Sequence, residues 1–276
     1  MHLAAERGPS REIGPVGRSL PAAAATGAAV GILGGLIGLG GAEFRLPLLI
    51  TVFGFVALQA VIVNKAMSLI VVLTAIPARL LGVPFDEVAP HWLDVVNLLA
   101  GSLVGAWLGA TWATRMASAT LYRVLAVLLV LIAGALAANH AGTIEPVSLP
   151  PALEMMAGVA AGMGIGVVAA LMGVAGGELL IPTFVLLYAV DVKVAGSLSL
   201  AVSLPTMLVA FARYSRDGSF VVLRRHRGFV ATMAAGSIIG TLIGGALVDV
   251  VSTAVLVPLL VALLLVSSIK VWRHDH

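Results

Sequence analysis

The chain has 276 residues, of which 60% are hydrophobic and 11% are charged, and its formal net charge is +3. Soluble domains carry about 25% charged residues, so this composition excludes an ordinary soluble protein and indicates a protein embedded in a lipid bilayer. The chain contains no cysteine, which excludes disulfide bonds, thiolate metal sites and cysteine catalysis.

Apolar segments follow one another along the chain, and most reach the length of about 20 residues that a membrane-spanning helix needs. Five lie in each half: 20–41, 46–63, 66–83, 95–114 and 119–138, then 152–176, 179–192, 194–212, 228–248 and 253–272. Almost no residues are left over for a soluble domain. The sequence therefore predicts an all-α, polytopic membrane protein.

The two halves of the chain repeat each other at a fixed offset of 135 residues. Residues 31–47 read GILGGLIGLGGAEFRLP, and residues 166–182 read GVVAALMGVAGGELLIP. The same offset still pairs Gly101 with Gly236 much further along the chain. One register held without gaps across most of both halves indicates an internal duplication.

Loop charges predict how the two halves are oriented. Basic residues gather in the N-terminal tail, in the 213–227 loop and at the C-terminus, which places these parts in the cytoplasm. Because each half holds an odd number of apolar segments, the second half is expected to be inverted relative to the first. The expected parts are a cytoplasmic tail 1–19, transmembrane repeat 20–138, external connector 139–151, transmembrane repeat 152–272 and cytoplasmic tail 273–276.

In each copy a run of glycines interrupts an apolar segment, and a glutamate and a proline follow. We expect a helix to end at the glycines and a new helix to start just before the proline, because proline is tolerated in a first turn. Such a start presents free backbone N–H groups and the positive end of the helix dipole, which together can bind an anion. The candidate substrate-binding residues of the two breaks are Gly38, Gly40, Gly41, Glu43, Arg45, Gly173, Gly176, Gly177 and Glu178.

The segments that follow the breaks are short. Segment 179–192 would rise only about 21 Å, against a hydrocarbon core of about 30 Å. The pair of segments that flanks each break is therefore either two spans or a re-entrant hairpin that enters and leaves on one side. Loop charges do not separate these alternatives, because both cross the membrane an even number of times.

Glu43 and Glu178 are the candidates for proton coupling. A carboxylate inside an apolar segment is costly and normally faces a cavity, a partner or a proton path. Loss of water favours its protonated form, so either residue could exchange protons and couple transport to the proton gradient. The alternative is a structural ion pair, for which Arg45 is near Glu43 whereas Leu180 occupies the matching position near Glu178.

Polar residues in the segment that follows each break extend the candidate site. They are Asn64, Lys65 and Ser68 in the first copy and Ser199 and Ser203 in the second, where Leu200 occupies the position that matches Lys65. Hydroxyl and amide groups at helical spacing suit oxyanion binding, with Lys65 as the neutralising charge. The alternative for the serines is hydrogen bonding between packed helices.

Glycines at four-residue spacing form a further pattern, which is typical of close helix packing and would also permit a homodimer. They are Gly101, Gly105 and Gly109 in the first half and Gly236, Gly240 and Gly244 in the second. The histidines outside these segments lack ligand spacing. We therefore predict no metal site, no cofactor and no catalytic residue.

The doubled motif, GLIGLGGAEFRLPLL and ALMGVAGGELLIPTF, resembles that of the sulfite exporter TauE/SafE family of membrane permeases over about residues 20–272. The resemblance implies a multi-pass transporter of the bacterial inner membrane that moves sulfur-containing anions, such as sulfite or sulfonates, outward. In that family the positions of Glu43, Phe44 and Arg45 are commonly glycine or aliphatic. A glutamate in both motifs suggests a subgroup whose substrate can differ from sulfite, or whose coupling can differ from that of other family members.

We therefore expect a secondary transporter of small anions, most of all sulfur oxyanions or organosulfonates, with possible coupling to protons. The alternatives are a passive anion channel, for which two helix ends would also serve, and a transporter of other small organic acids. An intramembrane enzyme would need clustered His or Asp residues or a nucleophile motif within the spans, and none is present. The expected partners are a small anion and the lipid bilayer, without nucleic acid.

Overall fold

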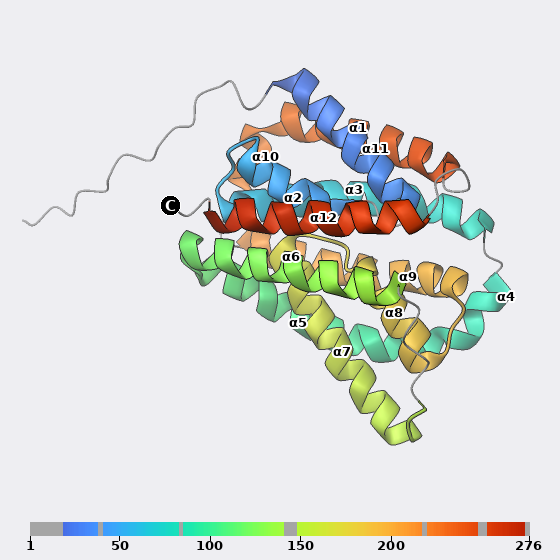
Figure 1. Cartoon of the computed structure of the whole chain (residues 1–276). Coiled ribbons are helices and arrows are strands. Elements are labelled where there is room, and N and C mark those ends of the chain that lie inside the picture. The colour runs from blue at the N-terminus through green and yellow to red at the C-terminus, as the bar shows by residue number, and fades with distance from the viewer. Residues whose placement is uncertain are drawn as a thin grey trace, which may run out of the picture.

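Figure 1 shows the protein as a computed structural model, which describes residues 19–37, 41–82, 85–140, 148–216, 220–247 and 253–273. Within these ranges the regular structure is entirely helical. Six of the described helices are long and apolar enough to cross a membrane, and three shorter apolar helices accompany them. The predicted all-α, polytopic architecture is confirmed.

The first half contains α1 (Leu20–Ile37), α2 (Ala42–Thr51), α3 (Ala57–Gly82), α4 (Phe85–Val88), the 3-10 helix η2 (Ala89–His91), α5 (Trp92–Arg115) and α6 (Ser118–His140). The second half contains α7 (Pro151–Met172), α8 (Gly177–Tyr188), α9 (Val192–Arg216), α10 (Val221–Arg225), α11 (Arg227–Ala246) and α12 (Thr253–Trp272). Helices α2, α5 and α6 begin 135 positions before α8, α11 and α12, so the helices follow the offset of the sequence repeat.

The two most extensive helix contacts join the first half of the chain to the second. Helix α1 packs along α11 and α7 packs along α5, so the first helix of each half lies on a helix of the other half. The offset converts one of these pairs into the other, as expected of two halves related by pseudo-two-fold symmetry. Helices α6 and α12 correspond to each other under the offset, and they run side by side through the middle of the view in Figure 1.

The glycine stripes are the contact surfaces of these helix pairs. A Cβ atom at Gly105 on α5 would meet the carbonyl oxygen of Met163 on α7, and one at Gly240 on α11 would meet that of Ala28 on α1. Gly101, Gly109, Gly236 and Gly244 likewise lie against backbone carbonyls of the partner helix. The packing interpretation is confirmed, and because the stripes are buried inside the chain they offer no surface to a second copy.

The segment after the first break differs from the prediction. Helix α3 runs without interruption through Asn64 and Lys65, so the predicted division between 46–63 and 66–83 is wrong. The chain turns instead at residues 52–56, where Gly54 has a φ of 65°. The two polar residues lower the hydropathy of the segment but not its helicity, because both side chains find hydrogen-bond partners inside the protein.

The prolines also lie further along than predicted. Pro47 and Pro182 each occupy the sixth position of their helices, α2 and α8, rather than the first turn. A proline inside a helix has no N–H group to donate to the carbonyl four residues earlier. That carbonyl belongs to Glu43 in α2 and to Glu178 in α8. The backbone carbonyl of each glutamate therefore lacks the hydrogen bond that a non-proline residue would donate.

Helices α2 and α8 are too short to cross a bilayer by themselves. Their 10 and 12 residues rise about 15 and 18 Å, against about 30 Å of hydrocarbon. Most side chains of α2 are buried, including all those from Ala42 to Pro47. Helix ends and turns inside a membrane must be covered by protein in this way, because lipid offers no hydrogen bonds.

Candidate functional site

Each short helix begins at a glycine in the left-handed conformation. Gly41, before α2, has a φ of 69°, and Gly176, before α8, has a φ of 87°. Neither helix start has a side-chain cap, so the first backbone N–H groups of both helices lack the partner that capping residues usually provide. A side chain at Gly41 would meet the carbonyl oxygen of Val30, whereas one at Gly176 would touch the Cβ of Ala169 at 3.3 Å.

The first turns of α2 and α8 bring two glutamates together. The carboxyl groups of Glu43 and Glu178 interact with each other, although the residues lie in different halves of the chain. Oε2 of Glu43 and both carboxylate oxygens of Glu178 are buried and accept no hydrogen bond within the described part of the chain. The N-terminal ends of the two short helices therefore meet in the protein interior.

Two buried cations accompany the glutamates. Arg45 interacts with Glu43, and Lys65 interacts with Glu178. Both cationic side chains have no exposed surface. The sequence offered no cation close to Glu178 along the chain, but the first half supplies Lys65 from α3.

Lys65 and Asn64 bind the backbone at the end of α7. The ammonium group of Lys65 donates hydrogen bonds to the carbonyl oxygens of Ala169 (2.8 Å) and Val174 (2.7 Å). The side-chain amide of Asn64 donates to the carbonyl of Met172 (3.1 Å) and to that of Ala42 (2.9 Å) at the start of α2. The last carbonyls of a helix lack intrahelical partners and carry its negative dipole end, so a cation stabilises them.

Two hydroxyl groups complete this capping of α7. Ser68 Oγ lies 3.2 Å from the carbonyl oxygen of Gly173 and 2.8 Å from that of Asn64 on its own helix. The hydroxyl of Tyr214, on α9, donates to the carbonyl of Ala170 at 3.0 Å. The sequence prediction did not include Tyr214, although a tyrosine just beyond the apolar segment 194–212 is the signal that could have identified it.

The backbone itself closes the second break. Gly173 adopts a φ of 69°, its N–H donates to Ala170, and the N–H of Val174 donates to Ala169. This pair of hydrogen bonds is the Schellman motif that commonly ends a helix at a left-handed glycine. The second break is therefore held both by its own backbone and by side chains from α3 and α9.

The matching serines of the second half make fewer contacts. Ser199 Oγ donates to the carbonyl of Gly196 on its own helix, at 2.8 Å. Ser203 Oγ is buried and has no hydrogen-bond partner among the described residues. Of the predicted first-break glycines, Gly38 and Gly40 lie outside the described residues.

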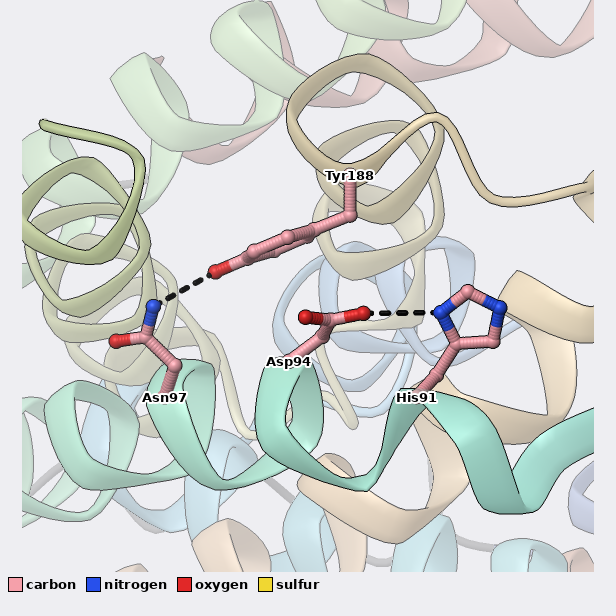
Figure 2. A network of polar contacts seen from close by, with 4 residues as sticks. All are labelled: His91, Asp94, Asn97 and Tyr188. Carbon is pink, nitrogen blue, oxygen red and sulfur yellow. Dashed lines mark hydrogen bonds and ion pairs between the residues drawn. The ribbon is translucent and has the colours of Figure 1, made fainter. Parts of the chain in front are cut away.

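A separate polar cluster lies at the other end of α8 (Figure 2). The amide of Asn97 on α5 donates to the hydroxyl of Tyr188 at 3.1 Å, and Nδ1 of His91 lies 2.9 Å from Asp94 Oδ2. The sequence prediction placed none of these residues in a site. They join the end of α8 to the start of α5, away from the glutamate pair at the start of α8.

A duplicated helical bundle with two broken helices that meet at buried charges is the architecture of a multi-pass membrane transporter. The family model for "Sulfite exporter TauE/SafE" matches residues 23–271. The chain belongs to this family of membrane transporters. The comparison with curated proteins and the comparison with solved structures gave no match.

Proposed function

We propose that the protein is a secondary transporter of the bacterial inner membrane that moves small anions, with sulfur oxyanions and organosulfonates as its substrates and with protons as the coupled ion. The family supports transport of sulfur-containing anions in general. The helix starts at Gly41 and Gly176, with the charged and polar side chains around them, are the proposed binding and coupling site.

The observation that carries this proposal is a group of buried polar atoms without protein partners beside two uncapped helix starts. Within the described residues it includes carboxylate oxygens of Glu43 and Glu178 and Oδ1 of Asn64, and Oγ of Ser203 on α9 is a further buried atom without a partner. Buried polar atoms are normally hydrogen-bonded, and those left over mark sites where water or a ligand completes the bonding. Helix N-termini favour negatively charged ligands, so the proposed ligand is an anion.

The carboxyl groups have a defined role in this proposal. An ionised carboxylate repels an anion, whereas a protonated carboxyl group can donate a hydrogen bond to an oxyanion. Proton binding at Glu43 or Glu178 and anion binding at the neighbouring helix starts therefore favour each other. This linkage couples transport to the proton gradient.

The proposed orientation places both termini in the cytoplasm and the connector 139–151 outside. The basic residues of the 213–227 loop and of the C-terminus support it under the positive-inside rule. A topology reporter fused at Gly142, which lies outside the described residues, should report an external position. A cytoplasmic report from that fusion would contradict the inverted arrangement of the repeats.

Flux into proteoliposomes tests the function. Sulfite, sulfate, thiosulfate, sulfoacetate and acetate are each offered with and without an imposed pH gradient, and protein-free liposomes are the control. We expect saturable flux of the sulfur-containing anions that the pH gradient drives. Flux that follows only the concentration gradient would support a passive channel, and flux of acetate alone would support a transporter of other organic acids.

A further inference from the structure

Four charged side chains form one string at the two helix starts: Glu43, Arg45 and Lys65 are buried, and Glu178 is half-buried with both carboxylate oxygens buried. Arg45 interacts with Glu43, Glu43 with Glu178, and Glu178 with Lys65. With every group ionised, the two positive and the two negative charges cancel. Neutrality is the low-cost state for such a site, because a net charge inside a membrane protein is expensive.

The elements that pack around the glutamates do not alter this balance in the described residues. The cations that interact with the two carboxyl groups are Arg45 on α2 and Lys65 on α3. Helix α7 contributes the backbone carbonyl of Ala169 to Lys65, and α9 contributes the uncharged hydroxyl of Tyr214 to the end of α7. A monovalent anion that entered the ionised string alone would leave one uncompensated negative charge.

We propose that one proton binds to the Glu43–Glu178 pair for each negative charge on the anion, so that the loaded site and the empty site are both neutral. Transport is then electroneutral. The proton adds to a carboxylate oxygen of the pair on one side of the membrane and leaves the same pair on the other side. This inference rests on the proposed function and adds its stoichiometry and its limit: two carboxyl groups accept two protons, so the substrates are mono- and divalent anions.

The hydrogen bonding of the pair agrees with this role. The oxygens of Glu178, and Oε2 of Glu43, accept no hydrogen bond in the described part of the protein. A proton added to the pair creates a hydrogen-bond donor beside the second carboxyl group, with which it interacts. That donor can bond to the anion, so the group that balances its charge also contributes to holding it.

The test uses the full chain in proteoliposomes with two probes, methanesulfonate as the monovalent anion and thiosulfate as the divalent anion. A pH gradient of one unit is expected to accumulate methanesulfonate about tenfold and thiosulfate about 100-fold at equilibrium, since each coupled proton contributes one factor of ten. A potassium diffusion potential set with valinomycin, at equal pH on both sides, is expected to accumulate neither anion.

The variant Glu178→Gln sharpens the test because it removes one negative charge and one proton site. Each anion should then cross with one proton fewer and carry a net negative charge. Methanesulfonate accumulation should lose its response to the pH gradient and follow the potential. The matched control is Glu154→Gln, because Glu154 lies in the first turn of α7 and outside the charge string. Transport by this variant should stay electroneutral.

The outcomes distinguish the proposed anion transport from the proposed proton stoichiometry. Accumulation that follows the potential in the unaltered protein overturns the stoichiometry but leaves anion transport standing. Electroneutral transport by a folded Glu178→Gln variant overturns the role of the pair in carrying the proton. Absence of flux for both probes and for sulfite in the unaltered protein overturns the proposed function and this inference together. The measurements on the unaltered protein decide the stoichiometry even if the variant does not assemble.

Discussion

The two breaks share a backbone plan but differ in what surrounds them. At the end of α7, side chains of α3 bind the carbonyls, with Lys65 contributing its terminal amino group. At the matching positions of α9 the chain has Ser199 and Leu200 instead of Asn64 and Lys65. Both copies thus provide the glycine turn and one glutamate, whereas the first copy alone provides the cations of the string. The duplication therefore repeats the glycine turn and the glutamate, but the cations that compensate the glutamates come from the first copy.

The far ends of the short helices differ in a similar way. In the last turn of α8, Tyr188 bonds to Asn97 near the His91–Asp94 pair, as Figure 2 shows. At the matching places beyond α2 the chain has Phe53 instead of Tyr188 and Phe229 instead of Asp94, and the two phenylalanine rings pack 4.9 Å apart. In Figure 1, α4 and α10, which precede α5 and α11, lie at opposite ends of the molecule. One end of the bundle is therefore closed by polar contacts and the other by aromatic ones.

The largest effect is expected from the glycines that both copies share. Gly41→Val and Gly176→Val should each abolish anion flux while membrane insertion persists, because valine is strained at a positive φ. Gly41→Val should also lose more thermal stability, since its side chain would meet the rigid backbone of Val30 rather than the methyl group of Ala169. Flux and thermal unfolding of the purified variants are the measurements.

The control for both substitutions is Gly134→Val on α6, where an added Cβ meets nothing within 4 Å. This variant should retain flux. If the Gly41 and Gly176 variants also retained flux, these glycines would have no role in transport beyond packing.

The next largest effect should come from the cation that the second copy lacks. Lys65→Met removes the ammonium group that binds Ala169 and Val174 and leaves the carboxyl group of Glu178 without its cation. The two buried carbonyls then lose a charged donor, and a hydrogen bond to a charged group contributes about 1.5–3 kcal/mol, so we expect lower thermal stability and weaker anion binding. The concentration dependence of flux and thermal unfolding measure the two effects separately.

Leu200→Met is the matched control, because it places the same side chain at the equivalent position of α9. A swap between two apolar residues of similar size should cost less than about 1.5 kcal/mol and leave flux unchanged. Equal effects of the two substitutions would show that the difference between the halves does not depend on the charge of Lys65.

A smaller effect should distinguish the paired serine from the unpaired one. Ser68→Ala removes a hydroxyl that contacts the carbonyl of Gly173, so we expect a loss of about 1 kcal/mol in the free energy of unfolding. Ser203→Ala removes a hydroxyl without a partner in the described protein, so stability should stay the same while anion affinity falls. Unfolding in denaturant and the concentration dependence of flux give the two readouts. Unchanged affinity in Ser203→Ala would exclude that serine from the site.

The sequence could predict features that each copy encodes locally. The helical class, the duplication, the glycine turns and the two glutamates all follow from residue patterns that recur at one offset. The capping of α7 could not be predicted, because Lys65 lies more than a hundred residues from the carbonyls it binds. The same contacts explain the wrong division of α3: hydropathy measures the cost of burying Asn64 and Lys65 but not the hydrogen bonds that offset it.

The smallest effect is expected at the polar end, where Tyr188→Phe would introduce the residue that the first copy has as Phe53. The substitution removes the hydroxyl that accepts from Asn97, and Asn97 Oδ1 already lacks a partner among the described residues. Loss of one neutral hydrogen bond costs about 1 kcal/mol, which thermal unfolding of the purified protein should resolve. The concentration dependence of flux should not change, because the pair lies at the end of α8 opposite Glu178. The converse variant, Phe53→Tyr, should be equally or more destabilising, since it introduces a hydroxyl into the packed contact with Phe229. A change in anion affinity in Tyr188→Phe, with stability preserved, would contradict a purely structural role and make this cluster part of the anion path.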